Sequence, residues 1–314
     1  MAVTEGKTLL QKADLALADL SSGGLLQPKQ FDSFIQLNIK EGTLLKDVVV
    51  TGMTNDREEY SKIRFSDRVL RPGTEAQALP VAQRSKPNLS KITLDSQLLR
   101  AEVRMSEEVA EDNIARGTFA TTVMAGFTKA INRDLETLLL RGDTTSPDLL
   151  LAVLDGLIKQ ATSNVVAGGS VKLNKEILRD MWKAMPDEFA TMGNVFYTNR
   201  QAVVDFKDGI SNRATTQGDL QLINGWGPGE FVWSDIKGKA NSLFPNNLGG
   251  GTDETVVLLT EPGVNIIVGF HRKVKFKTVE IPQDGVLLIV GSLRVDVKYL
   301  EETAVVKATA VKGA

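Results

Sequence analysis

The feature that most constrains this chain is a stretch of 36 residues without proline, residues 106–141, whose pattern predicts a single helix. Ser106 before two glutamates suits a helix N-terminus, and Arg141 before Gly142 suits a C-terminus with a left-handed cap. At 1.5 Å per residue this helix would be about 54 Å long, more than the core of one compact domain can cover. Gly117 and Gly126 inside it predict a bend or a closely packed neighbour. Apolar residues recur along one stripe at three- and four-residue steps: Val109, Ala120, Val123, Met124, Phe127, Ala130, Ile131, Leu135 and Leu138.

The 314 residues, of which 42% are hydrophobic and 24% charged, suit a soluble protein of two domains or one large elaborated domain. A net charge of −2 argues against a dedicated nucleic-acid binder. Cysteine is absent, which excludes disulfides, thiolate metal sites and cysteine nucleophiles. No signal-peptide pattern opens the chain, and its longest apolar run, residues 149–154, is far shorter than the ~20 residues of a membrane helix. We therefore expect a chain that is made and folded in a cytoplasm, without a membrane partner.

Before the long helix, the pattern predicts short helices over residues 5–20 and 28–39 and a strand over residues 45–50. Two longer strands are expected over residues 63–70 and 91–103, because apolar and polar side chains partly alternate there. The segment between them holds three prolines and few bulky apolar groups. This arrangement predicts a long two-stranded arm, which needs a partner surface because an isolated hairpin is marginal in water. An ordinary edge hairpin fits the same residues equally well.

After the long helix, Ser146, Pro147 and Asp148 predict the start of a helix that runs to about Ala161. A second helix is expected from its cap at residue 174 to the proline at residue 186. From residue 255 the chain is nearly all strand, with a turn at residues 282–285. The remaining expected elements are strands at residues 195–198 and 231–233, a short helix at 200–207, and closing strands at 256–259, 264–279, 286–299 and 304–311.

The residues offer no candidate for catalysis, for a cofactor or for a metal. His271 is the only histidine, two basic residues follow it, and no nucleophile elbow accompanies it. The triplet at residues 6–8 lacks the first glycine and the preceding strand of a phosphate-binding loop. Residues 141–143 spell a cell-adhesion tripeptide but are better explained as a helix end and a turn. We therefore expect a protein that is not an enzyme.

One charge pattern remains, in the strand expected after residue 264. Lys273, Lys275 and Lys277 alternate with Val274 and Phe276, which places the three lysines on one face of the strand. Such a face is the solvated outside of a half-buried sheet, or a salt-bridging surface for an acidic neighbour, or a surface towards nucleic acid.

The order of the parts is itself informative. A short N-terminal arm, an extended two-stranded loop and one very long helix precede a mixed region and a closing series of long strands. Short sequence patterns follow one another along the chain at residues 138–143, 157–158, 182–185, 195–199, 257–262, 269–274, 293–297 and 303–307. Together these features resemble the major capsid proteins of tailed bacteriophages, whose Hong Kong 97-like fold is shared with encapsulin shells.

The resemblance implies an α+β fold that covers nearly the whole chain. Its implied parts are an N-terminal arm at 1–43, an extended loop (E-loop) with its base at 44–104, a spine helix of the peripheral (P) domain at 105–144, an axial (A) domain at 145–263, P-domain strands at 264–300, and a terminal strand at 301–314 that returns to the A domain.

The implied function is mechanical. Copies of the chain would self-assemble in the host cytoplasm, as hexamers and pentamers, into the icosahedral shell of a virion around a double-stranded DNA genome. A portal, separate scaffolding or decoration proteins and weak non-specific DNA contacts are the other implied partners. Since the arm starts almost at Met1, scaffolding is expected to be a separate protein or absent. The alternative is an encapsulin-type shell around a cargo enzyme.

The resemblance also implies contacts between subunits. The lysines of the closing strand would meet acids of an adjacent copy, and basic residues of the extended loop would lie near a neighbour, where some relatives cross-link through a lysine. The expected contact residues are Lys273, Lys275 and Lys277 with Glu107, Glu108 and Glu111, and on the loop Arg71, Lys86 and Lys91.

Overall fold

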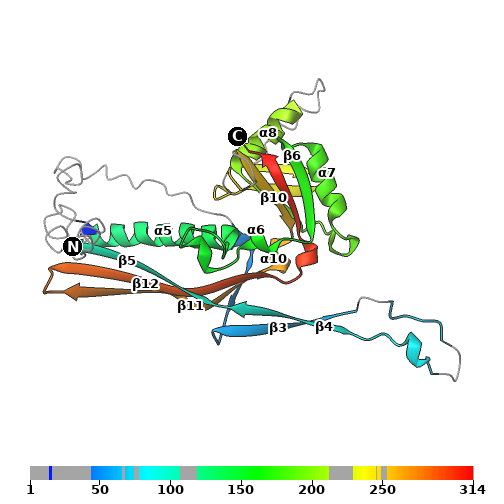
Figure 1. The fold of residues 1–314 in the computed structure, drawn as a ribbon, viewed down its shortest axis with the longest axis horizontal. Coiled ribbons are helices and arrows are strands. Elements are labelled where there is room, and N and C mark those ends of the chain that lie inside the picture. Colours follow the sequence, from blue (N-terminus) through cyan, green and yellow to red (C-terminus); the bar gives the residue numbers. More distant parts are fainter. Residues whose placement is uncertain are drawn as a thin grey trace.

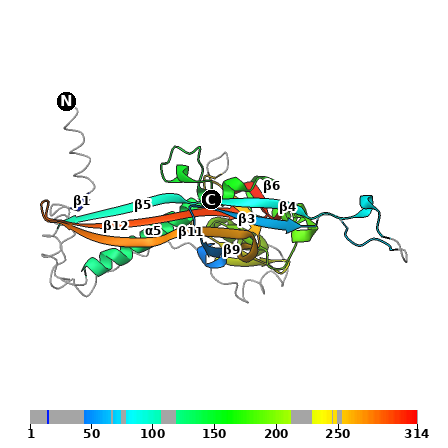
Figure 2. The ribbon, with the colours of Figure 1, turned by 90° about the horizontal axis from the view of Figure 1, so that it is seen from below.

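The computed structural model describes residues 14–15, 44–65, 68–73, 78–106, 119–211, 229–244, 246–248 and 253–313. Within these ranges the chain forms two β-sheets, a long helix that runs along one sheet to the other, and a two-stranded arm that projects from the rest (Figure 1). Seen from below, the arm continues the long direction of the first sheet and reaches well beyond both sheets (Figure 2).

The first sheet has five strands and is built on the longest hairpin of the described chain. Two strands pair antiparallel from Ile266 opposite Tyr299 to Ile281 opposite Val286, and the turn between them uses Gly285 at a positive φ of 59°. In spatial order the strands are β1 (Asp14–Leu15), β5 (Gln97–Ser106), β12 (Val286–Tyr299), β11 (Ile266–Ile281) and β2 (Val49–Gly52).

The second sheet has six strands and carries two helices. In spatial order the strands are β6 (Asn164–Lys172), β13 (Val306–Lys312), β10 (Glu254–Thr260), β7 (Val195–Thr198), β9 (Ile236–Ala240) and β8 (Glu230–Trp233). The helices α7 (Lys175–Ala184) and α8 (Arg200–Ser211) bury their apolar faces against it, with Met181 and Phe206 in a core that includes Phe231.

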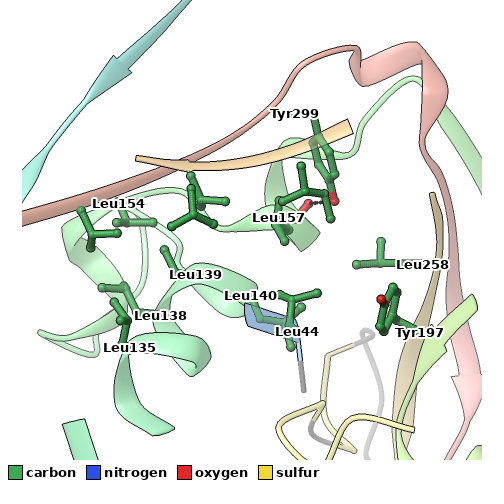
Figure 3. Packing of buried hydrophobic residues seen from close by; sticks show 14 of the residues in the cluster. Leu44, Leu135, Leu138, Leu139, Leu140, Leu154, Leu157, Tyr197, Leu258 and Tyr299 are labelled. Atoms are coloured by element: carbon green, nitrogen blue, oxygen red, sulfur yellow. Dashed lines mark hydrogen bonds between the residues drawn. The ribbon is translucent and has the colours of Figure 1, made fainter. Parts of the chain in front are cut away.

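The helix α5 (Phe119–Arg141) connects the two sheets. Along its length it lies on the first sheet, where the rings of Phe127 and Phe276 are 5.9 Å apart. Its last turns enter a core that both sheets share, and Leu138, Leu139 and Leu140 are each 0% exposed. A helix that is apolar on all sides is buried on all sides. In Figure 3, Leu138 lies near Leu135 and Leu154, and Leu140 lies nearer to Tyr197 and Leu258 of the second sheet.

The arm consists of β3 (Arg57–Arg64) and β4 (Asn88–Asp95) and forms a sheet of its own. The two strands pair antiparallel from Arg57 opposite Asp95 to Arg64 opposite Asn88. Short elements complete the described fold: α3 (Leu44–Asp47), η3 (Val81–Gln83), η5 (Leu151–Val153), α6 (Leu157–Gln160), η6 (Asp187–Phe189), α10 (Pro262–Asn265) and η7 (Glu302–Ala304).

The predicted helix start at Ser106 is wrong. Ser106 is the last residue of β5 and pairs with Val286, so the residue expected to cap the helix belongs to a strand. The described helix has 23 residues, about 34 Å, and ends at Arg141 as predicted. Gly142 follows but lacks the positive φ of a left-handed cap, and a Cβ on Gly126 would meet nothing within 4 Å, so no close neighbour in the described chain explains that glycine.

Several strand and helix boundaries also differ from the predictions. The arm strand expected at 63–70 lies at 57–64, and the one expected at 91–103 is broken at Ser96 into β4 and β5, which belong to different sheets. The strand expected at 45–50 is divided between α3 and β2. Asp14 and Leu15 pair as a strand with β5, which contradicts a helix there; the rest of residues 5–20 and all of 28–39 lie outside the described residues.

The helix predicted from Ser146 to Ala161 is replaced by turns, η5 and α6. Its side-chain caps form locally, since Asp148 Oδ1 accepts a bond from the Leu150 N–H at 2.9 Å, but Gly142 and Gly156 bond backbone to backbone at 2.8 Å and hold the segment as a loop. The cap at Asn174 is confirmed: its Oδ1 accepts bonds from two amide groups of α7, each at 2.9 Å. Across the described residues, no helix is long and apolar enough to cross a membrane.

Candidate functional site

The arm presents apolar side chains to solvent on both strands and in the connection between them. Leu70 is 85% exposed, Val81 75%, and Leu89 69%. Ile63, Phe65 and Val69 are also exposed. A sheet of two strands has no core of its own, and a cluster of exposed large apolar groups marks a surface for binding another molecule. The outer arm is therefore the strongest candidate for an interaction site in the described chain.

The root of the arm is fixed to the first sheet by a small apolar core. Leu94, at 0% exposure, packs with Met53 and Ile267. A Cβ on Gly269 would lie 2.7 Å from the Met53 sulfur and 2.9 Å from a Leu94 methyl group. Only glycine allows β11 and the arm root to approach this closely. The backbone N–H of Met53 also donates to the Phe270 carbonyl at 2.9 Å, which adds a backbone contact between the root and β11.

Two aspartates complete the root. Asp296 is 4% exposed and accepts a bond from the Asp95 N–H at 2.7 Å; burial raises the pKa of its carboxyl group, and this bond opposes the shift. Asp56 accepts a bond from Arg294, which lowers the pKa of Asp56. The Nδ1 of His271 lies 2.9 Å from the same carboxylate. The single histidine is thus a structural neighbour of the arm root.

Along its outer side, β3 contacts residues of the second sheet's region. Lys62 donates to the Leu300 carbonyl and, at 3.2 Å, to Glu301. Arg64 pairs with Glu188 and lies 5.3 Å above the ring of Phe189. The exposed pair of Arg64 and Glu188 contributes only about 0–1 kcal/mol. The pair of Lys62 and Glu301 is half-buried.

A second polar cluster, which we call the inter-sheet cluster, lies where α3 and α5 meet. Glu136 is 3% exposed, and its Oε1 accepts bonds from the Leu44 N–H at 2.6 Å and from the Asn241 side-chain amide at 3.1 Å. Burial raises the pKa of the Glu136 carboxyl group, and the two bonds oppose the shift. Leu44 itself is buried in the shared core.

The same cluster continues at the other end of α3. Asp47 accepts bonds from the Tyr197 hydroxyl and the Lys239 ammonium group, both at 2.7 Å. Burial, then the bond to Asp47, raises the pKa of Tyr197. Because Tyr197 and Lys239 belong to the second sheet and Glu136 to α5, the short helix α3 ties the two halves of the molecule together.

The structure separates the contact residues expected from the sequence. Lys91 lies on β4 and pairs with Glu59 of its own arm at 2.9 Å. Arg71 and Lys86 lie exposed in the connection between the arm strands, and Lys277 is exposed on β11. Glu107, Glu108 and Glu111, and the side chains of Lys273 and Lys275, lie outside the described residues. None of these positions tests the contacts between subunits, which remain predictions.

The predicted common face of the three lysines needs one correction. Arg272 pairs with Arg294 and Lys275 with Ser292, so β11 has one more residue than β12 over this interval. A bulge of this kind interrupts strict alternation. Lys275 and Lys277 keep the two-residue spacing of regular pairing, but the spacing no longer fixes the side on which Lys273 lies.

The sequence prediction missed Glu136, Asp47 and Asp296. A signal existed for Glu136, because the buried Leu139 and Leu140 follow it at helical steps of three and four, and a carboxylate at such a position is buried with a partner. No comparable pattern identifies the other two. Among the described residues, no group of three or more histidine, cysteine, aspartate or glutamate side chains could hold a metal ion.

A helix lying on one sheet, a second sheet that shares its core, and a two-stranded arm with an apolar surface define a subunit of the Hong Kong 97-like shell class. Solved structures have the same fold. The capsid of a native GTA particle aligns with a TM-score of 0.66, at 11% identity over 95% of this chain and 99% of that chain. A chain of Mycobacterium phage Adephagia aligns with a TM-score of 0.62, at 13% identity over 95% of this chain and 98% of that chain. A chain of the holo-SrpI encapsulin complex of Synechococcus elongatus PCC 7942 aligns with a TM-score of 0.57, at 12% identity over 96% of this chain and 98% of that chain.

The chain belongs to the phage capsid family. The family's sequence model, described as "Phage capsid family", matches residues 23–238. The "Putative prophage capsid protein YqbE" of Bacillus subtilis (strain 168) is 34% identical over 309 residues, which cover 97% of this chain and 98% of that protein. The expected fold and the expected family are therefore confirmed, and the chain is a major capsid protein that forms a phage shell.

Proposed function

We propose that copies of this chain close an icosahedral shell around a double-stranded DNA genome and that the arm of each copy fastens it to a neighbour. The observation that carries this proposal is the row of exposed apolar side chains on an element that the described part of its own body leaves uncovered. Contacts between different surfaces of identical subunits generate closed rings and shells. An arm that extends beyond the body supplies one such surface.

The energy of one arm contact is modest. Fully burying a large apolar side chain contributes about 1.5–3 kcal/mol, so covering three or four of the arm residues contributes at most about 5–12 kcal/mol. The loss of translational and rotational freedom on association offsets part of this gain. Single contacts are therefore weak, whereas a subunit held on several sides gains by multivalency. Weak single contacts also allow misplaced subunits to dissociate before the shell closes.

The remaining parts of the proposal follow the family. The first sheet, β11, β12 and α5 would form the P domain, the second sheet with α7 and α8 the A domain, and residues 301–314 the returning strand. Hexamers and pentamers would be the building units, assembled in the host cytoplasm with a portal and with any scaffolding or decoration protein. Contact with DNA would be weak, non-specific and made through phosphates. The protein would not act as an enzyme.

The alternative of an encapsulin-type compartment rests on the fold alone, at a TM-score of 0.57 and 12% identity, and is weaker than the phage shell. The neighbouring genes discriminate between the two. Terminase and portal genes support a phage head, whereas a peroxidase or ferritin-like gene supports an encapsulin. Electron microscopy of the concentrated protein would show whether closed particles form and what they enclose.

Deletion of residues 70–90 tests the fastener directly. The deletion removes most of the exposed apolar groups of the arm but keeps Met53, Leu94 and Ile267 at its root. We expect a soluble subunit with an unchanged melting temperature that forms no particles in electron micrographs. Replacing Leu70, Val81 and Leu89 by serine should give the same result with the full length of chain. Particles of normal size from the deletion variant would show that the arm is not the fastener, and from the serine variant that these three apolar side chains are not needed.

A further inference from the structure

The loop that follows α5 is closed at its base, so its backbone is held in one position. The Gly156 N–H donates to the Gly142 carbonyl at 2.8 Å, where the two ends of the loop meet. The Lys159 ammonium group lies 2.5 Å from an oxygen of Asp143 and 3.1 Å from one of Asp155, which links the same two ends by charge. Compact surface loops whose ends lie close together are frequently functional.

Leu149 is the apolar tip of this loop. Its side chain is 90% exposed, the largest value for any large apolar residue in the described part of the chain. The residues after it turn inward, since Leu150 and Val153 pack against the shared core and Leu154 is buried. The Asp148 carboxylate accepts a bond from the Leu150 N–H at 2.9 Å and fixes the backbone on both sides of the tip. A side chain presented on a fixed backbone loses little conformational freedom when it binds.

A hollow that matches a leucine side chain lies between α7 and α8 on the second sheet. Its volume is about 200 Å³, and its apolar lining consists of Leu173, Phe206 and Ile210, with Gly209 beside them. A Cβ on Gly209 would meet nothing within 4 Å, so no described residue fills the space next to this glycine. A protein core from which one leucine side chain has been removed has a cavity of about 150 Å³, so the hollow can hold a leucine.

The charges around the tip and around the hollow are opposite in sign. Residues 143–160 include three acidic residues and one basic residue, a net charge of −2, whereas residues 172–184 include four basic and two acidic residues, a net charge of +2. Asp148 beside the tip and Lys175 on the rim of the hollow are both exposed, and neither forms an ion pair within the described residues. Glu176 shares the rim, so the attraction is modest and the apolar contact supplies most of the binding energy.

We infer that Leu149 of one copy of this chain sits in the hollow between α7 and α8 of a second copy. The loop does not fill the hollow of its own copy, because it packs on the core that both sheets share, whereas Leu173 and Phe206 belong to the separate core of the second sheet. The contact joins two different surfaces, and such contacts build rings of identical subunits. It goes beyond the proposed role of the arm, since no arm residue takes part in it.

The absence of cysteine makes a disulfide test direct. Particles of the double variant Leu149→Cys, Gly209→Cys are purified, oxidised, and dissociated in SDS without a reductant for gel electrophoresis. A disulfide needs two Cα atoms within about 7 Å, so we expect a series of linked dimers and larger oligomers that a reductant removes. The matched control is Leu149→Cys, Met192→Cys, with the second cysteine at an exposed residue outside the hollow. A series no stronger than that of the control would overturn the inference.

A second experiment measures the critical concentration for assembly by light scattering. Leu149→Ala removes the tip, and Gly209→Leu fills the hollow; each should raise the critical concentration about tenfold or more without lowering the melting temperature. Because both changes remove the same contact, the double variant should assemble no worse than the poorer single variant. Met192→Ala should stay within about twofold of the unaltered protein.

Normal assembly of both single variants, or losses that simply add in the double variant, would overturn the inference. The arm is unaltered in every one of these proteins. The outcome for the loop and the hollow is therefore separate from that of the deletion of residues 70–90, which tests the arm.

Discussion

Glu136 offers the sharpest test of how the two halves of the subunit are joined. Its carboxylate accepts bonds from the Leu44 N–H and the Asn241 amide, and it is 3% exposed. Glu136→Ala removes the acceptor and leaves both donors buried. A buried donor without a partner costs about 1–3 kcal/mol, so the two together cost about 2–6 kcal/mol. Removing the carboxylate also removes the free-energy cost of burying it, which offsets part of this loss. We expect a net destabilisation of about 3 kcal/mol.

Glu136→Gln separates the hydrogen bonds from the charge. The Gln oxygen has two lone pairs and can accept both bonds, but the side chain does not ionise. Burial raises the pKa of Glu136 above its ordinary value of 4.5 in the folded subunit. Such a group contributes stability that is present below the unfolded pKa and is lost as the pH rises through the folded pKa. The Gln variant should therefore match the unaltered protein near pH 4.5 and exceed it in stability as the pH rises.

Urea denaturation of the unassembled subunit, followed by circular dichroism from about pH 4.5 to 8, measures both effects. The difference between the two proteins isolates Glu136, because every other titrating group is common to both. Glu102→Ala, at an exposed carboxylate of β5, is the control and should change the free energy of unfolding by less than about 0.5 kcal/mol. The reasoning is refuted if Glu136→Ala is no worse than this control, or if Glu136→Gln follows the unaltered protein at every pH.

Two further predictions follow from backbone packing and from the lysines of β11. Gly142→Ala should destabilise the subunit by about 1–3 kcal/mol, because its Cβ would lie 2.7 Å from the Leu138 carbonyl oxygen and closer still to that of Leu154. Gly126→Ala, with nothing within 4 Å, should instead stabilise α5 by about 0.5–1 kcal/mol; urea denaturation giving the reverse order would contradict the packing at residue 142. Charge reversal at Lys273, Lys275 and Lys277 should block assembly without lowering the melting temperature, and normal particles in electron micrographs would leave these lysines as solvated surface.

Two elements with local signals were predicted well from the sequence. The Asn174 side chain caps α7 through amides two and three residues away, and the β11–β12 turn closes over four residues with its own glycine. In both cases the residues that determine the structure are adjacent in the chain. The sequence also predicted that the arm needs a partner surface, because a two-stranded element has no core of its own, but it did not single out the exposed apolar groups of the connection.

Elements that depend on distant residues were not predictable in this way. Ser106 has the side chain of a helix cap, yet Val286, 180 residues further on, pairs with it and makes it a strand end. The break at Ser96 depends on the bond from Asp95 to Asp296, which joins residues 201 positions apart. Local preferences of about 1 kcal/mol cannot compete with a complete strand pairing. The domain boundaries stay a prediction for the same reason, since the shared core crosses them.

The two features that matter most for assembly differ in how far the sequence reveals them. The basic and apolar composition of the arm can be counted directly in residues 62–91, and only its exposure needed the structure. The inter-sheet cluster needed the fold itself, because Glu136, Asp47 and their partners come from four separate elements. An arm that must meet a neighbour needs a surface of suitable composition, whereas a junction that holds two sheets at one angle needs partners in fixed positions. The first property belongs to a segment, and the second exists only after the chain has folded.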